Sequence, residues 1–184
     1  SWRAAAACQQ AGIPAAEHLF FVAARKHLLR QEVLFTRGIN PRTASDAWQY
    51  FELNFAPPRS PEKIAKKREL LRELGSLLSK VKKSGIMLPD FKLHNLVLAE
   101  PEGERPRLVL VDLSEAETGR PDYPEMVFLE RFSPHLLRSP AFTAGDYVRL
   151  IRAYLEAGDD PRTWPEICQG IIERAKKRNR DLKP

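Results

Sequence analysis

The middle of the chain carries the clearest repeat of apolar and polar positions. Between Pro61 and about Lys83, apolar residues recur at steps of three, four and seven, which predicts one long amphipathic helix. Ser60 is a suitable N-cap, proline is tolerated at the first helical position, and Gly85 ends the helix. The predicted buried face consists of Ile64, Leu71, Leu74, Leu78 and Val81.

The basic residues of this helix are assigned mostly to its opposite face. We expect their side chains to be solvated and to keep the helix soluble. Contact with a membrane or a lipid headgroup is the alternative for this face. The residues concerned are Lys63, Lys66, Lys67 and Arg68.

Two pairs of short apolar runs predict two β-hairpins. Residues 18–24 and 28–36 are rich in Phe, Val and Leu, and a basic turn at 25–27 separates them. Residues 96–99 and 108–111 form the second pair, around a polar loop at 101–107. Because the long helix separates the two hairpins, this order predicts an α+β fold rather than a parallel β-α-β sheet.

Capping residues and breakers place the shorter helices in the first third of the chain. The opening residues to Gln10 have the pattern of a helix end, closed by Gly12-Ile13-Pro14. Thr43 or Ser45 can cap a short helix that contains Trp48 and that the prolines at 57–58 end.

The chain is predicted to be helical again beyond Pro124. Thr143 caps one helix, Gly158 closes it, and Thr163 opens a final helix that ends in the basic run 176–180. That run complements the helix dipole, and the wider basic cluster from Arg174 to Lys183 could also bind nucleic acid or acidic lipid. No regularly spaced aromatic residues accompany it, so we expect no nucleic-acid partner.

Composition and charge narrow the class of protein. Of the 184 residues, 43% are hydrophobic and 29% are charged, which is typical of a soluble globular chain. The net charge of +6 favours anionic partners, such as phosphorylated ligands or an acidic membrane surface. Cys8 and Cys168 lie far apart without a CxxC pair, so neither a disulfide framework nor a zinc site is predicted.

Four polar residues on two neighbouring turns carry the candidate chemistry. Phosphoryl transfer from a nucleotide needs a carboxylate that orients the attacking hydroxyl, a cation near the γ-phosphate, and oxygen ligands for Mg²⁺. Asp90, Lys92 and Asn95 supply these groups within one tight loop after the long helix. The second hairpin then returns Asp112 beside Asn95, as a two-ligand metal site requires. His94 lies inside the loop without an evident partner, so we expect it to be solvated or packed.

The loop and the returning strand resemble those of a known superfamily. Asp90-Phe91-Lys92-Leu93-His94-Asn95 is similar to the catalytic loop of the protein-kinase-like superfamily, and Val111-Asp112-Leu113 resembles its metal-binding motif. Within it, the chain most resembles the lipopolysaccharide kinases, the Kdo and heptose kinase group of bacterial envelope synthesis. The Gly12-Ile13-Pro14 turn, the Asp-Leu in place of Asp-Phe-Gly, and the late helix from Asp146 to Leu155 also resemble this group. The resemblance covers roughly residues 2 to 175.

The resemblance implies a role for each matching residue. Asp90 would be the catalytic group that accepts or orients the proton of the sugar hydroxyl, and Lys92 would neutralise the transferring phosphoryl group. Asn95 and Asp112 would bind Mg²⁺ with ATP. The segment Thr36-Arg37-Gly38 falls where this fold has its hinge, so its backbone would be expected to meet adenine.

The sequence departs from the superfamily pattern at three points. Leu88-Pro89 stands where His-Arg or His-Gly is usual, and Ser114 replaces the usual glycine of Asp-Phe-Gly. The sequence also contains no Gly-rich loop, no strand lysine and no helix glutamate in the positions that clamp ATP. Since the chain begins at Ser1 with the end of a helix, we expect that upstream sequence is absent and that these 184 residues alone have no turnover.

The resemblance implies a domain organisation and a function. Residues 1–39 would be the remainder of a kinase-like N-lobe, and residues 40–184 the C-lobe, with the catalytic loop at 88–95 and the metal-binding segment at 111–114. The implied activity is ATP-dependent phosphorylation of a Kdo or heptose hydroxyl of the lipopolysaccharide inner core. The implied partner is an anionic glycolipid or sugar acceptor, met at the cytoplasmic face of the inner membrane with peripheral membrane contact.

Two alternatives to this function stay open at the level of sequence. The protein could be a kinase-like phosphotransferase that acts on another small molecule or on a protein. It could also be a catalytically inactive pseudokinase or scaffold, which Leu88 and the missing nucleotide-clamping elements favour.

Overall fold

The computed structural model of the chain describes residues 2–16, 18–26, 29–36, 44–89, 91–99, 106–113, 115–119, 129 and 139–181. Its helices are α1 (Trp2–Gln10), α2 (Ala47–Phe55), α3 (Pro61–Lys83), α5 (Ala144–Ala157) and α6 (Trp164–Asp181), with a 3-10 turn η1 (Leu93–Asn95). Its strands are β1 (His18–Lys26), β2 (Leu29–Thr36), β3 (Ala44–Asp46), β4 (Ile86–Met87), β5 (Leu96–Ala99), β6 (Arg107–Leu110) and β7 (Glu117–Thr118). They form three small antiparallel sheets, ordered β1-β2, β3-β5-β6 and β4-β7, which confirms the α+β prediction.

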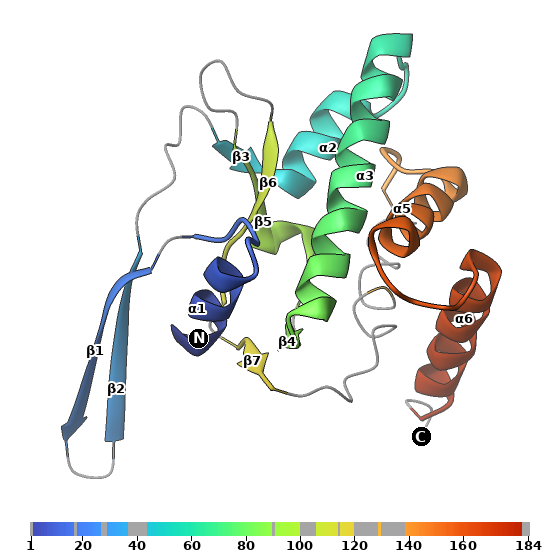
Figure 1. Cartoon of the computed structure of the whole chain (residues 1–184). Helices are drawn as coiled ribbons and strands as arrows, with labels where there is room; N and C mark the ends of the chain where they lie inside the picture. The colour runs from blue at the N-terminus through green and yellow to red at the C-terminus, as the bar shows by residue number, and fades with distance from the viewer. Residues whose placement is uncertain are drawn as a thin grey trace.

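The long helix α3 is the centre of the molecule (Figure 1). It runs between the three-stranded sheet and α1 on one side and α5 and α6 on the other. As predicted, Ser60 caps it, and the serine hydroxyl accepts the Lys63 N–H at 3.3 Å. Gly85 follows its end with a φ of +65°, a conformation that favours glycine. The buried leucine and valine residues of α3 are Leu70, Leu71, Leu74, Leu77, Leu78 and Val81.

Helix α5 lies closely against α3 at a glycine. A methyl group on Gly75 would lie 2.7 Å from the Ala153 Cβ and 2.7 Å from the Tyr154 backbone nitrogen, so this position has no room for a side chain. Helix α5 begins at its predicted cap, Thr143, whose hydroxyl accepts the Asp146 N–H at 3.2 Å. The Asp146 carboxylate accepts the Thr143 N–H in return, at 2.9 Å, which completes a capping box.

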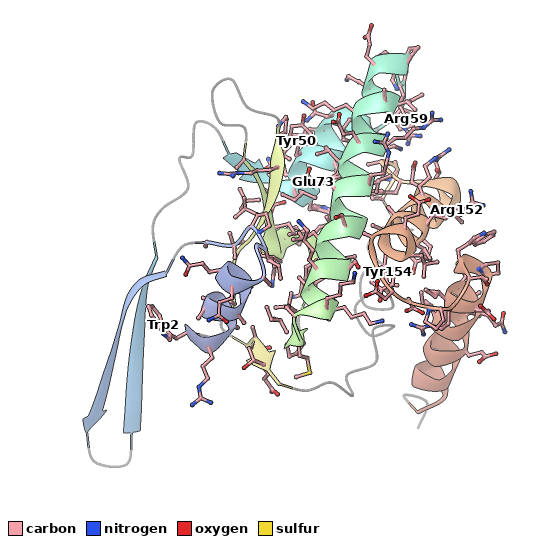
Figure 2. All side chains as sticks on the ribbon, in the orientation of Figure 1. Trp2, Tyr50, Arg59, Glu73, Arg152 and Tyr154 are labelled. Carbon is pink, nitrogen blue, oxygen red and sulfur yellow. The ribbon has the colours of Figure 1, made fainter. Side chains whose placement is uncertain are left out.

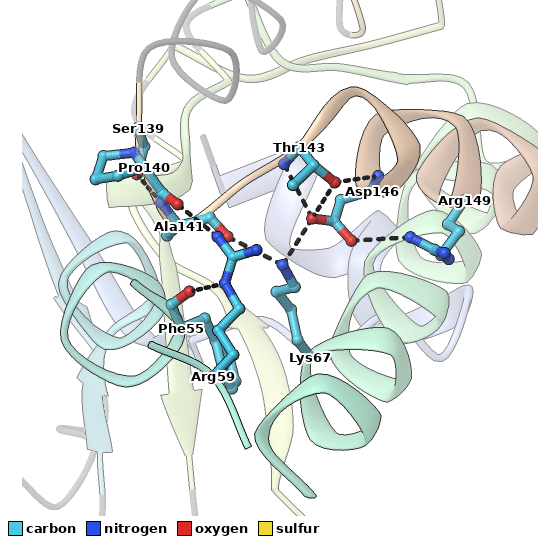
Figure 3. Close-up of polar contacts among 9 residues, drawn as sticks. All are labelled: Phe55, Arg59, Lys67, Ser139, Pro140, Ala141, Thr143, Asp146 and Arg149. Carbon is cyan, nitrogen blue, oxygen red and sulfur yellow. Dashed lines mark hydrogen bonds and ion pairs between the residues drawn. The ribbon is translucent and has the colours of Figure 1, made fainter. Parts of the chain in front are cut away.

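Lys67 contradicts the prediction that the basic residues of α3 are solvated. Its side chain is only 3% exposed, and Nζ lies 2.6 Å from Asp146 Oδ2 (Figure 3). Nζ also donates to the Ala141 carbonyl at 3.0 Å. Lys67 stands three residues after Ile64 and four before Leu71, so its position belongs to the apolar face of the helix. The other three basic residues of the set, Lys63, Lys66 and Arg68, are exposed as predicted.

The carboxylate of Asp146 is ionised more readily than an ordinary aspartate. Burial on its own raises the pKa of Asp146, but hydrogen bonds from Lys67 and Thr143, with the Lys67 charge, outweigh it and lower the pKa. Arg149 adds a further ion pair at 3.1 Å.

The segment before α5 is also tied to α2, because Arg59 donates to the carbonyls of Phe55 and Pro140 (Figure 3).

Strand β6 is an edge strand, and several of its outward backbone groups find partners outside the sheet. The Leu108 N–H donates to the carboxylate of Glu73 at 2.5 Å. Glu73 belongs to α3 and is labelled in Figure 2. The Leu110 N–H donates to the Pro14 carbonyl, and the Ala16 N–H donates to the Leu110 carbonyl, both at 2.8 Å. The strand that leads into the candidate metal segment is therefore held by α3 and by the residues after α1, as well as by β5.

The N-terminal hairpin is present, but its first strand is longer than predicted. Strand β1 continues through Arg25 to Lys26, which pairs with Leu29, so the predicted turn at 25–27 is wrong at its first two residues. As few as two residues can join the strands of an antiparallel hairpin, so β1 can extend further toward the turn than predicted. Long basic side chains are compatible with a strand. Figure 1 shows this hairpin extending away from the helices.

Helix α2 has a different N-cap from the one predicted. Asp46 caps it, and Asp46 Oδ1 accepts the Gln49 N–H at 2.9 Å. Ser45 belongs instead to β3, which pairs with β5 and which the sequence pattern did not reveal. A strand of three residues is too short to show an alternating pattern. Thr43 lies outside the described residues.

The predicted helical region beyond Pro124 is described only from residue 139 onward, apart from residue 129. Helices α5 and α6 confirm the prediction there. In the described part of the chain, no helix combines the length and the apolar character that crossing a membrane requires.

Candidate active site

Buried side chains anchor the loop that follows α3. Strand β4 first pairs with β7, and the chain then places Leu88, Phe91 and Leu93 in the hydrophobic core. Lys92 lies between Phe91 and Leu93, and Asn95 follows two residues later. Both side chains are half-buried. Leu88, which stands where the superfamily usually has histidine, is thus a core residue. Apolar packing holds this side of the loop.

Backbone hydrogen bonds hold the candidate metal segment beside the loop. Leu96 pairs with Leu110 at the end of the β5–β6 hairpin. Just beyond this pair, where β6 has ended and β5 has not yet begun, the Val111 N–H donates to the Asn95 carbonyl at 2.9 Å. The Asn95 N–H in turn donates to the Lys92 carbonyl at 3.0 Å, which closes the η1 turn. The hairpin therefore brings residue 112 next to Asn95.

Asp112 has an unusual backbone conformation. Its φ is +55°, the left-handed region, which costs a residue with a Cβ atom about 1–2 kcal/mol. Aspartate adopts this region more readily than most residues. The reversal lets Leu113 enter the core while Asp112 is exposed. Strained conformations of this kind concentrate at ligand sites.

Asn95 and Asp112 line one small pocket together with Glu115. Its volume is about 60 Å³. Amide and carboxylate oxygens are ligands that Mg²⁺ accepts, and Mg²⁺ typically takes one or two protein carboxylates and completes its shell with phosphates and water. Among the described residues, no cluster of three His, Cys, Asp or Glu forms a closed metal cage. The amide of Asn95 and the carboxylates of Asp112 and Glu115 are ligand types compatible with a Mg²⁺ ion that completes its shell with phosphates and water. The apolar lining consists of Leu88, Pro89, Phe91, Leu110, Val111, Leu113 and Ala116.

Only some of the other predicted site residues belong to the described part of the chain. Asp90 lies outside the described residues, although its neighbours Pro89 and Phe91 both line the pocket. Residues 37 and 38 of the predicted hinge also lie outside them. Thr36 ends β2 and its backbone pairs with His18. The chain just before His18 bonds to Leu110, so Thr36 lies on the β6 side of the molecule.

His94 is largely exposed and packs against Trp48, as expected, but it also has a polar partner that the sequence did not reveal. Its Nδ1 lies 3.2 Å from Asp46 Oδ2, and the centroid of its ring lies 5.8 Å from that of Trp48. These partners come from the end of β3 and the start of α2. Sequence reasoning missed them because the pairing spans 48 positions. The available signal in the sequence is Asp46, an N-cap type of residue immediately before the apolar start of α2.

The comparisons with known proteins identify a family and a fold. A sequence model of the lipopolysaccharide kinase (Kdo/WaaP) family matches residues 1–154. A solved structure described as WaaP in complex with acyl carrier protein superposes with a TM-score of 0.75 at 18% sequence identity. That alignment covers 100% of this chain and 75% of the other chain. A search of curated proteins found no match. Because the family match spans well over half of the sequence and the protein-kinase-like fold agrees with it, the chain belongs to the lipopolysaccharide kinase (Kdo/WaaP) family.

Proposed function

We propose that this protein transfers the γ-phosphoryl group of ATP to a hydroxyl of a Kdo or heptose sugar in the lipopolysaccharide inner core. The hydroxyl oxygen forms a bond to the γ-phosphorus while the bond from that phosphorus to the bridging oxygen of ADP breaks. The hydroxyl proton passes to a carboxylate, and ADP leaves with the bridging oxygen. Family membership supports a kinase, and the acceptor sugar is part of the proposal.

One observation carries the proposal. Asn95 and Asp112, from two different turns, line the same pocket, and the Val111–Asn95 hydrogen bond fixes the two turns together. We assign both residues to Mg²⁺, which screens the negative charge of the ATP phosphates when it is bound. Asp90 is assigned to the hydroxyl proton and Lys92 to the charge of the transferring group, following the family pattern.

The nucleotide and the lobes are assigned from the same comparison. We place adenine against the backbone of residues 36–38, which follow the N-terminal hairpin in the sequence. Residues 1–39 then correspond to part of the small lobe and residues 40–184 to the large lobe. The 184 residues contain no G-x-G-x-x-G sequence. We propose that these residues alone have no turnover.

The acceptor and the location follow from charge and family. A net charge of +6 favours an anionic glycolipid as acceptor and an anionic surface nearby. We propose that the protein acts peripherally at the cytoplasmic face of the inner membrane, where cytoplasmic leaflets attract basic proteins.

The test is a phosphorylation assay on the protein as its gene encodes it. ATP and Mg²⁺ are supplied with Kdo-bearing, heptose-bearing and sugar-free acceptors, and both ADP release and acceptor mass are measured. Asp112→Asn is expected to lower kcat/KM by about 100-fold or more, because one preorganised charge at a transferring group has that effect. The matched control is Asp159→Asn, since Asp159 is 84% exposed and pairs only at the surface with Lys83.

The outcomes separate the alternatives. Transfer to a protein or another small molecule, and not to either sugar, would move the proposal to a different acceptor. Binding of Mg²⁺-ATP without any transfer would support a scaffold. Full activity of Asp112→Asn would remove the metal assignment.

A further inference from the structure

A polar and aromatic group lies beside the candidate catalytic loop and has no part in the proposed phosphoryl transfer. It consists of His94, Asp46 and Trp48, which we call the His94 group. The His94 side chain is 55% exposed and directly precedes Asn95. None of the three residues lines the pocket of Asn95 and Asp112. The His94 group therefore lies outside the lining of the candidate metal pocket.

Asp46 fixes the tautomer and the direction of His94. Its Oδ1 accepts the Gln49 N–H at the start of α2, and its Oδ2 lies 3.2 Å from His94 Nδ1. A carboxylate can only accept, so the hydrogen of a neutral imidazole is assigned to Nδ1 and Nε2 is left as an acceptor. Trp48 lies against the imidazole and stacks on Phe142, with ring centroids 6.3 Å apart, which limits where the imidazole can turn.

The position of His94 limits what it can meet. His94 and Asn95 are consecutive residues of the η1 turn, so a group bound at Asn95 lies near the backbone of His94. On the proposed function, the metal and the phosphates occupy the pocket that Asn95 and Asp112 line. The exposed part of the loop, which carries His94, is then left for the molecule that supplies the attacking hydroxyl. His94 is thus placed on the acceptor side of the reaction centre.

Resting on the proposed function, we propose that His94, held by Asp46 and Trp48, binds the acceptor sugar through a hydroxyl next to the one that is phosphorylated. A fixed acceptor nitrogen beside aromatic rings suits a ligand that offers hydroxyl donors and apolar ring faces together. The chemical class is therefore a polyhydroxylated sugar ring. His94 selects which hydroxyl of that ring faces the phosphoryl group, as a positioning residue.

The test compares acceptor and ATP kinetics in the protein as its gene encodes it. His94→Ala is expected to raise the KM for the sugar acceptor by about 5- to 10-fold, the effect of one lost hydrogen bond, and to leave the KM for ATP unchanged. His94→Gln, whose side-chain carbonyl can accept, is expected to restore part of the affinity. Asp46→Asn keeps the N-cap, because Asn caps helices as well as Asp does, and loses the carboxylate that orients His94.

Deoxy acceptors make the test specific. An acceptor that lacks the neighbouring hydroxyl is expected to have the same KM with wild type and with His94→Ala. Without that hydroxyl, the hydrogen bond to His94 cannot form in either protein. A structural role of His94 would instead raise the KM of every acceptor equally. Melting curves and Asp159→Asn serve as controls for folding and for loss of a surface charge.

The results distinguish this inference from the proposed function. If wild type phosphorylates a sugar and His94→Ala leaves the acceptor KM unchanged, the role of the His94 group is overturned and the kinase assignment stands. If the variant raises the KM for ATP instead, His94 belongs to the nucleotide side and the inference is wrong. If wild type transfers phosphate to no sugar at all, the proposed function fails and this inference fails with it.

Discussion

Replacing Lys67 by methionine removes the cation from a buried ion pair at the centre of the fold. Methionine has a similar length and no charge, so Lys67→Met deletes the 2.6 Å contact with Asp146 and the 3.0 Å hydrogen bond to Ala141. The Asp146 carboxylate, only 4% exposed, would stay buried. Its remaining partners are Thr143 and the half-exposed Arg149.

The structure sets the size of the expected loss. Removing one partner of a buried pair typically costs about 3–5 kcal/mol, because the other charge stays desolvated. Thr143 and Arg149 still bind Asp146, so we expect the lower end, about 3 kcal/mol. For a chain of this length each kcal/mol shifts Tm by about 2–4 °C, so Lys67→Met should lower Tm by roughly 6–12 °C.

Urea unfolding followed by far-ultraviolet circular dichroism measures this loss. The control is Lys66→Met, the same substitution one position earlier, where the lysine is exposed and lies 5.3 Å from the Tyr50 ring centroid. We expect Lys66→Met to change the free energy of unfolding by less than about 1 kcal/mol. Adding Asp146→Asn to Lys67→Met should recover part of the loss, because the unpaired charge is removed. A loss below 1 kcal/mol for Lys67→Met, with an unchanged urea dependence, would contradict the burial of this pair.

Three further predictions concern the pH dependence of stability, the contact between α3 and α5, and the N-cap of α3. Because the folded-state pKa of Asp146 is lowered, its stabilisation is complete above its unfolded pKa of about 4 and is lost as the pH falls through the lower folded value; acid titration of stability should therefore be shallower in Lys67→Met than in wild type. Gly75→Ala should destabilise by about 1–3 kcal/mol despite the better helix propensity of alanine, because its Cβ meets Ala153, and an unchanged melting temperature would refute this close approach. Ser60→Ala should cost about 1 kcal/mol in chemical unfolding and Ser60→Asn almost nothing, since only the second keeps the cap; equal losses would show that the cap does not matter.

The elements with strong local patterns could be predicted from the sequence. The apolar period and the Ser60 cap predicted α3, and Thr143 predicted the start of α5. The β5–β6 hairpin follows from two short apolar runs around a polar loop, and it places Asp112 beside Asn95. These predictions work because each depends on residues that are close together in the chain.

Features that depend on distant residues were missed. The charge of Lys67 predicts a solvated side chain, whereas its position on the apolar face of α3 and its partner Asp146, 79 residues away, bury it. The pairing of Asp46 with His94 and the short strand β3 have no local pattern either. The positive φ of Asp112 is set by the core position of Leu113, which only the folded chain reveals.

The leucine at position 88 bears directly on the choice between an enzyme and a scaffold. In sequence, Leu88 favours a scaffold, because a histidine that ties the loop to the metal segment is missing. In the structure, Leu88, Phe91 and Leu93 are each less than 7% exposed, and fully burying such a side chain stabilises by about 1.5–3 kcal/mol. One neutral hydrogen bond contributes only about 0.5–1.5 kcal/mol. Apolar anchoring, together with the Val111–Asn95 bond, can therefore fix this loop at least as firmly, so Leu88 is no argument against catalysis.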